Sequence, residues 1–301
     1  MTNQKQPIPI SPARPLPAER LPQRLELELP DGYRTAVYAH ALAEADRLPV
    51  LYVHGIQSHP GWFMGSAAAL ASRGHAVFQV TRRGSGENET DRGHADSAGQ
   101  LLDDVGAACG FVLGRTGCRR LHLLGVSWGG KLLAAYAASA RDQQAVASLT
   151  MVAPGIAPRV DLPAARKLSV CLSAMVAPRR RFGIPLNDPQ LFTDNEAMRE
   201  YLRKDRFALH RATARLLLAS HRLDVVLRRA SRGAVGVPTS LLLAEKDRII
   251  DNAATRQVVE RLTAGRCVAR ELPGCHVLEF EPDPHGLYAA LADAMADAEM
   301  Q

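Results

Sequence analysis

A serine flanked by glycines lies where an apolar run of the sequence passes into a helical pattern. The stretch LHLLGVSWGGKLLAAYA covers residues 121–137, with Ser127 at its Gly-x-Ser-x-Gly centre. Gly125 and Gly129 lack side chains that would collide in a sharp turn from strand to helix, so the serine hydroxyl can stand exposed on strained backbone. The pattern predicts a nucleophilic serine. The alternative is a glycine-rich turn that lets a helix pack close to a strand.

A serine hydroxyl becomes a strong nucleophile only when a base takes its proton. His276 follows the predicted strand Cys267–Leu272, at the sheet edge where parallel strands place their ligands. His285 comes at a predicted helix start, where a capping or surface role fits it better. The other histidines are His210 and His221 in a helical region and His40, His54, His59, His75, His94 and His122 before the serine. We therefore expect His276 to be the base.

The base needs a carboxylate that orients it, and the stretch LLLAEKDRIIDN (residues 241–252) offers three. Asp247 lies three residues beyond a predicted strand, and Glu245 lies closer to that strand. Asp251 precedes a predicted helix, where it fits a capping role. We predict Asp247 as the orienting residue, with a simple polar turn as the alternative interpretation. Ser127, Asp247 and His276 then occur in the chain order that this chemistry shows on parallel sheets.

Acyl transfer also requires donors for the negative charge that develops on the carbonyl oxygen. The stretch LYVHGIQ (residues 51–57) ends a predicted strand in a second glycine turn. The backbone N–H groups of Ile56 and Trp128 can point at the same spot, where each preorganised donor contributes about 3 kcal/mol in the transition state. We interpret His54 as a structural hydrogen-bonding residue of this turn rather than as a base.

The surrounding pattern alternates short apolar runs with amphipathic segments. This alternation predicts an α/β fold with a mostly parallel sheet wrapped by helices on both faces. Strands are expected at Arg24–Leu29, Tyr33–Leu42, Leu48–Val53, His75–Val80, Arg120–Gly125, Ala147–Val152, Val237–Ala244 and Cys267–Leu272. Helices are expected at Phe63–Ser72, Ala98–Leu113, Gly129–Ala140, Ala253–Thr263 and Pro284–Ala298.

Two segments fall outside this alternation. Residues 1–24 are rich in proline and predict a flexible leader, so the core is expected over 25–157 and 236–301. Residues 158–235 show no strand-like alternation and predict a helical cap, with amphipathic pieces at Asn195–Leu202 and Ala208–His221. The apolar piece Leu168–Ala177 is too short to span a bilayer. We interpret it as a buried core helix, with a lipid-facing or channel-lining segment as the alternative.

Composition narrows the class of protein. The chain of 301 residues has 47% hydrophobic and 23% charged residues, ordinary values for a sizeable globular core. Its net charge of +6 is concentrated in residues 158–235, which hold 16 Lys and Arg against 7 Asp and Glu, a surplus of 9. That surplus is interpreted as a solvated surface, with weak contact to a membrane surface as the alternative. No nucleic-acid-binding signature accompanies it, so no nucleic acid partner is expected.

Membrane spans, secretory signals and cysteine spacing bear on the cellular location of the protein and on its metal content. No apolar window reaches the ~18–20 residues of a membrane span, and the N-terminus has no secretory signal. The cysteines form no Cys-x-x-Cys pair, which predicts reduced thiols in a cytoplasmic protein and argues against a zinc site. We expect neither a cofactor nor a metal. The oligomeric state stays open.

The motifs VHGIQSH, TRRGSGEN, GVSWGG, AEKDRIID and CHVLEFE, in this order, resemble the α/β-hydrolase superfamily over about residues 24–298. Within it they are most similar to the monoacylglycerol lipase and lysophospholipase-like branch, also called serine aminopeptidase-like. The resemblance implies an eight-stranded sheet, Ser127 as nucleophile, Asp247 and His276 as its partners, the Ile56 and Trp128 amides as oxyanion hole, and a cap over an acyl tunnel. Gly-Val-Ser-Trp-Gly departs from the family's usual Gly-His-Ser-Met-Gly, and the oxyanion turn lacks a second glycine.

These observations predict a serine hydrolase that cleaves a carboxylic ester, lipid-like or small, through an acyl-enzyme. A peptidase, a thioesterase or an acyltransferase would use the same three side chains, and the sequence does not separate them. A dehalogenase or epoxide hydrolase is disfavoured, because those proteins resemble this fold but carry aspartate where Ser127 stands. A non-catalytic ligand-binding protein on the same fold is the alternative from a different class.

Overall fold

The computed structural model describes residues 16, 20–42, 45–139 and 143–300. Most of the predicted leader, residues 1–24, therefore lies outside the described residues. An eight-stranded sheet forms the centre of the molecule, in the order β1-β2-β4-β3-β5-β6-β9-β10. Its strands are β1 (Gln23–Glu28), β2 (Arg34–His40), β3 (Val50–Val53), β4 (Val77–Val80), β5 (Leu121–Val126), β6 (Val146–Val152), β9 (Thr239–Ala244) and β10 (Cys267–Leu272).

The sheet is parallel from β4 to β10, whereas β1 and β2 form an antiparallel hairpin that adds to β4. Strands β3 and β5 are neighbours although β4 comes between them in the sequence. The strand order therefore reverses at β3, and such a switch point opens a crevice beyond the carboxyl ends of the strands. The fold class predicted from the alternation is confirmed.

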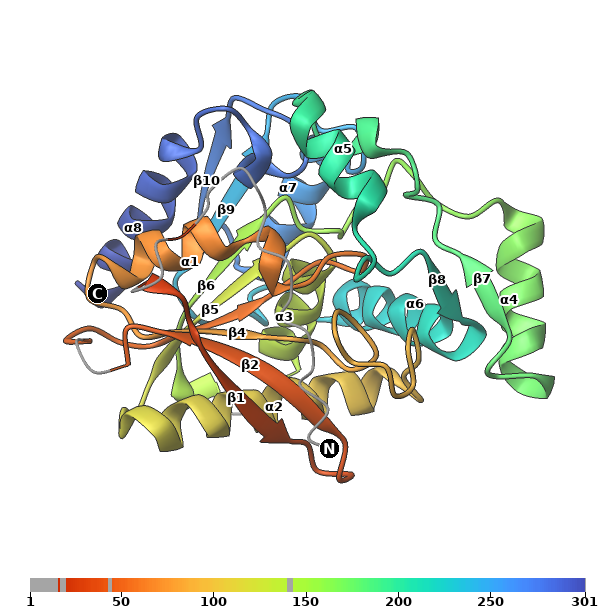
Figure 1. Cartoon of the computed structure of the whole chain (residues 1–301), viewed down its shortest axis with the longest axis horizontal. Helices are drawn as coiled ribbons and strands as arrows, with labels where there is room; N and C mark the ends of the chain where they lie inside the picture. The colour runs from red at the N-terminus through yellow and green to blue at the C-terminus, as the bar shows by residue number, and fades with distance from the viewer. Residues whose placement is uncertain (1–15, 17–19, 43–44, 140–142, 301) are drawn as a thin grey trace.

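Helices cover both faces of this sheet (Figure 1). Helices α1 (Met64–Ala71) and α8 (His285–Glu299) pack together on one face, and α2 (Ala98–Thr116) and α3 (Trp128–Ala138) pack together on the other. Helix α7 (Asn252–Leu262) packs against β9 and β10. Strands β3 to β6 are buried along their whole length, as expected for strands covered on both faces.

The segment between β6 and β9 folds over one end of the sheet as a cap, at the right of Figure 1. It contains α4 (Ala164–Val176), β7 (Arg181–Gly183), α5 (Glu196–Lys204), β8 (Arg211–Thr213) and α6 (Ala214–Arg229). The expectation of no strand here is wrong, because β7 and β8 pair antiparallel. Each strand has three residues, too few for a readable alternation, and the two partners lie about thirty residues apart in the sequence.

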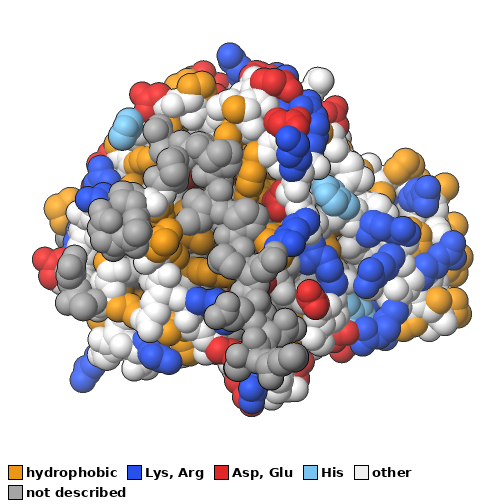
Figure 2. Space-filling model, in the orientation of Figure 1, with side chains coloured by type: hydrophobic (Ala, Val, Ile, Leu, Met, Phe, Trp, Pro, Cys, Tyr) orange, Lys and Arg blue, Asp and Glu red, His pale blue; other side chains and the backbone are white. Residues whose placement is uncertain are grey.

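Helix α4 corrects a second expectation. The sequence predicts a buried core helix here, yet Leu168, Leu172, Met175 and Val176 are each more than half exposed. Only Val170, Ser173 and Ala174 are buried, so the helix is amphipathic, with one face on the cap interior. Figure 2 shows the basic surface of the cap, where Lys and Arg side chains gather with apolar side chains among them. None of the helices that the structure describes combines the length and the apolar composition that a bilayer-spanning segment needs.

Candidate active site

Ser127 lies between the end of β5 and the start of α3 on strained backbone. Its φ of 52° and ψ of −121° belong to a backbone region that residues other than glycine rarely adopt. The flanking glycines make this turn feasible. A Cβ on Gly125 would lie 2.7 Å from the Cα of Gly130, and one on Gly129 would run into the carbonyl oxygen of Val53. The sharp turn from strand to helix therefore needs both glycines.

Three side chains that are distant in the sequence form a hydrogen-bonded chain at this turn. His276 Nε2 lies 2.9 Å from Ser127 Oγ, and His276 Nδ1 lies 2.8 Å from Asp247 Oδ2. The imidazole is 1% exposed and Asp247 is 6% exposed, so water does not compete for these bonds. This geometry lets the imidazole take the serine proton while the carboxylate holds the ring in one tautomer.

Asp247 is fixed as a charged acceptor. Its Oδ1 accepts the backbone N–H groups of Ile249 and Ile250 at 2.8 and 3.0 Å. Burial by itself would raise the pKa of Asp247, but His276 and these N–H groups together hold the pKa below its ordinary value. The competing acids lie elsewhere: Glu245 is exposed, and Asp251 caps α7 by accepting the N–H of Ala254 at 2.9 Å.

The two residues predicted to supply the oxyanion donors lie beside Ser127. Ile56 follows β3 and Trp128 begins α3, and both line the cavity that contains Ser127. Within the described chain, neither of their N–H groups has a hydrogen-bond partner. Gly55 allows the close approach of the two turns, because a Cβ there would lie 3.3 Å from the Cβ of Ser127. Free, rigidly held N–H groups at this place can bind an oxyanion.

Arg82, which the sequence reasoning did not single out, holds the oxyanion turn in shape. It is 5% exposed, and its Nη2 donates to the carbonyl oxygens of Gly55 and Ile56 at 2.7 and 2.9 Å. Its guanidinium lies 4.6 Å from the ring centroid of Trp128. Burial lowers the pKa of Arg82 to about 9, so it remains charged at neutral pH. The only signal for it in the sequence is its place in the TRRGSGEN motif.

Among the described histidines, only His276 hydrogen-bonds to the serine hydroxyl. His54 Nε2 accepts the backbone N–H of Arg82 at 3.1 Å, and Nδ1 bonds the carbonyl oxygen of Gly55 at 2.9 Å. Burial, together with the charge of Arg82, holds the pKa of His54 well below its ordinary value, which suits a neutral structural residue. His285 is exposed at the start of α8, and His210 is exposed in the cap.

The cap closes a cavity of about 250 Å³ over Ser127. Most of its lining is apolar and comes from the cap, with Val170 from α4, Leu217 and Leu218 from α6, and Ile184 and Leu186 from the loop between β7 and α5. A cavity of this kind can accept a carbon chain next to the serine. One of its walls also carries polar groups.

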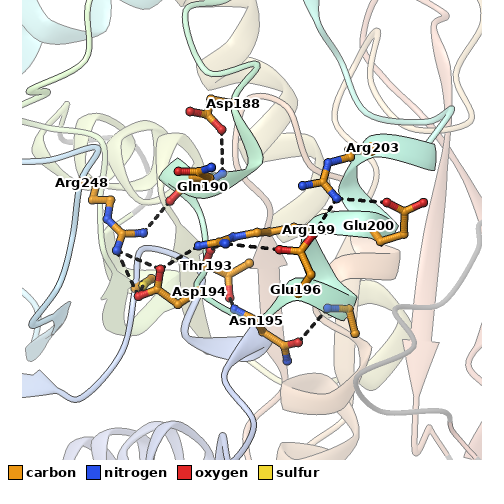
Figure 3. Close-up of polar contacts among 12 residues, drawn as sticks. Asp188, Gln190, Thr193, Asp194, Asn195, Glu196, Arg199, Glu200, Arg203 and Arg248 are labelled. Atoms are coloured by element: carbon orange, nitrogen blue, oxygen red, sulfur yellow. Dashed lines mark hydrogen bonds and ion pairs between the residues drawn. The ribbon is translucent and has the colours of Figure 1, made fainter.

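A second contact between cap and core braces the loops that carry Asp247 and His276. Both carboxylate oxygens of Asp194, in the cap, accept hydrogen bonds from Arg248 Nη2, at 2.9 and 3.0 Å (Figure 3). Asp194 also pairs with Arg199. The thiol of Cys275 donates a hydrogen bond to the same carboxylate, with 3.3 Å between Cys275 Sγ and Asp194 Oδ2. Arg248 follows Asp247 and Cys275 precedes His276, so one carboxylate of the cap reaches both loops. We call these three residues, Asp194, Arg248 and Cys275, the loop clamp.

The described residues also contain one cluster whose donor atoms suit a cation. Atoms of His75, His122 and Glu299 lie within 4.8 Å of one another. Glu299 pairs there with Arg47 at 2.5 Å. His75 and His122 lie at the amino ends of β4 and β5, the opposite edge of the sheet from Ser127, so the cluster takes no part in the chemistry of the serine.

The protein has a mostly parallel sheet with helices on both faces, a cap, and a serine on strained backbone hydrogen-bonded to a histidine that an aspartate holds. Together these features define an α/β-hydrolase. Within this class, residues 44–283 match the family described as serine aminopeptidase, S33, and the chain belongs to that family. The predicted superfamily and its serine aminopeptidase-like branch are thereby confirmed. No curated protein matches the chain.

Several solved structures share the fold. A monoacylglycerol lipase from Paleococcus ferrophilus is 19% identical, with 87% of this chain and 99% of that chain covered and a TM-score of 0.72. A soluble variant of monoglyceride lipase from Saccharomyces cerevisiae is 17% identical over 95% and 99% of the two chains, with a TM-score of 0.77. A thermophilic esterase from Thermogutta terrifontis is 20% identical over 92% and 99%, with a TM-score of 0.67.

Proposed function

We propose that this protein is a serine hydrolase that cleaves a carboxylic ester through an acyl-enzyme. The observation that carries the proposal is the hydrogen-bonded chain Ser127–His276–Asp247 beside two backbone N–H groups that have no partner among the described residues. The apolar cavity next to Ser127 supports an acyl group as the part of the substrate that is bound.

In the proposed reaction, Ser127 Oγ attacks the ester carbonyl while His276 Nε2 takes the hydroxyl proton. The amides of Ile56 and Trp128 bind the tetrahedral oxyanion. When the intermediate collapses, the C–O bond to the alcohol breaks and His276 returns the proton to the departing oxygen. Water, deprotonated by His276, then attacks the acyl-serine, and a second collapse releases the carboxylic acid and restores Ser127.

Amide, thioester and acyl-transfer substrates would use the same groups with another leaving group or acceptor. The mostly apolar lining suits an acyl chain and favours it over the polar backbone of a peptide. A binding protein without catalysis would have no need for a hydroxyl held within 2.9 Å of an imidazole on strained backbone.

The test combines a mechanism-based probe with a substrate panel. A fluorophosphonate probe should label the wild-type protein, and Ser127→Ala should abolish both labelling and ester hydrolysis. p-Nitrophenyl esters from acetate to palmitate, monoacylglycerols and aminoacyl amides should show ester cleavage as the fastest reaction. Labelling that persists in Ser127→Ala, or a wild type that is never labelled, would overturn the proposal, and the second result would favour a binding protein.

A further inference from the structure

One wall of the cavity beside Ser127 combines polar groups from α3 and α6. Lys131 of α3 and Ser220 and Asp224 of α6 line it together, and Lys131 is 5% exposed. Lys131 Nζ lies 3.1 Å from Ser220 Oγ and 2.9 Å from Asp224 Oδ1. Lys131 comes four residues after Ser127, so its Cα lies one helical turn, about 6 Å, further along α3. The polar wall is therefore within reach of a chain bound to the serine.

The hydrogen bonds of this wall are incomplete. Ser220 Oγ accepts from Trp128 Nε1 at 2.8 Å and from Lys131 Nζ, which uses both of its lone pairs. The hydroxyl proton of Ser220 has no acceptor among the described residues, and the ammonium of Lys131 has a third N–H without one. Asp224 Oδ1 is buried and lies 2.9 Å from Lys131 Nζ, and within the described part of the chain no second donor reaches it, so one of its lone pairs stays open. Two donors and one acceptor thus remain available at one place.

Lys131 is buried, whereas Ser220 and Asp224 are partly buried, and unused polar groups in such a wall cost free energy unless a ligand or water completes them. A hydroxyl group suits this set, because it accepts from Ser220 or Lys131 and donates to Asp224 in the same position. A carboxylate suits it less well, since Asp224 would repel it and the pair of Lys131 and Asp224 has no net charge. The Trp128 indole, which departs from the family's usual methionine, holds Ser220 in place.

We propose that Lys131, Ser220 and Asp224 form a subsite for a hydroxyl group on the acyl chain of the substrate. The preferred substrates are esters of hydroxylated carboxylic acids, in which the hydroxyl lies several bonds from the scissile carbonyl. This inference rests on the proposed function, because it names the substrate class of the same serine.

The experiment compares matched esters. We would measure kcat/KM for the p-nitrophenyl esters of hexanoate and 6-hydroxyhexanoate, and of octanoate and 8-hydroxyoctanoate. At one of these lengths the hydroxylated ester should react on the order of tenfold faster, because the unsubstituted chain leaves the polar wall unpaired. Ser220→Ala and Lys131→Met should each lower this ratio toward one. Arg222→Met, an exposed change on the same helix outside the cavity, should leave the ratio as in the wild type.

The outcomes separate the two proposals. If the wild type hydrolyses all four esters with ratios near one at both lengths, the subsite is overturned while the serine hydrolase stands. A preference that survives in Ser220→Ala, the smaller change, also overturns it, even where Lys131→Met fails to fold. If the wild type cleaves no ester and takes no fluorophosphonate label, the proposed function falls and the subsite falls with it.

Discussion

Glu279, three residues after His276, offers a test of the electrostatics that hold this loop. It is 2% exposed, and its Oε1 accepts the backbone N–H of Ser66 at 2.9 Å and the hydroxyl of Tyr288 at 3.1 Å. Its Oε2 is buried and has no hydrogen-bond partner within the described chain. Burial is the dominant influence and raises the pKa of Glu279 from 4.5 to about 7.

The sign of the effect follows from proton binding. Between pH 4.5 and 7 the native protein keeps the Glu279 proton that the unfolded chain has lost, so the free energy of unfolding falls as the pH rises. At about 1.4 kcal/mol per pH unit, the full penalty above pH 7 is about 3 kcal/mol, and about 2.5 kcal/mol of it develops between pH 5 and pH 8. Glu279→Gln removes the charge and keeps an oxygen that can accept from Ser66 and Tyr288.

The assay is urea unfolding of the wild type and of Glu279→Gln at pH 5 and pH 8. The glutamine's buried N–H₂ group costs the same at both pH values, so it cancels in the comparison. Relative to the wild type, Glu279→Gln should therefore gain about 2.5 kcal/mol of stability on going from pH 5 to pH 8. Glu89→Gln, which removes an exposed carboxylate, is the matched control. If the stabilities of wild type and Glu279→Gln change in parallel with pH, the buried-charge reasoning is refuted.

Two further predictions concern the groups around His276. Asp247→Asn should lower kcat on the order of 10⁴-fold with an unchanged unfolding transition, because the wrong imidazole tautomer would be held; steady-state kinetics check this, and a nearly normal kcat would move the orienting role to another acid. Asp194→Asn should release the loop clamp and lower kcat about three- to tenfold, with little change in KM. Each 1.4 kcal/mol that a misplaced His276 or Asp247 adds to the activation free energy lowers the rate tenfold. The acid limb of the pH–rate profile should change as well. Glu200→Gln, which cuts only exposed ion pairs with Arg203 and Lys204, is its control, and equal kinetics of the two variants would rule out the positioning role.

The order of strands and helices in the core was predictable because each element carries its own period and its own end signals. The predicted ends of the core elements lie within three residues of the observed ones. The cap strands β7 and β8 were missed because three residues carry no period, and only pairing across the intervening chain makes them strands. The exposed face of α4 was missed because the apolar composition of a helix does not indicate which of its faces packs against another element.

For the site, the sequence by itself determined the serine turn, because glycine spacing and strand-to-helix character are local properties. It also narrowed the base and the acid to residues after two strands. Tertiary structure decided which carboxylate reaches the imidazole. Glu245, Asp247 and Asp251 lie within seven residues of the chain, and only the side chain of Asp247 points toward His276. Packing also brought Arg82 under the oxyanion turn and Lys131 against α6. Such contacts join residues that are far apart in the chain, and no local pattern records them.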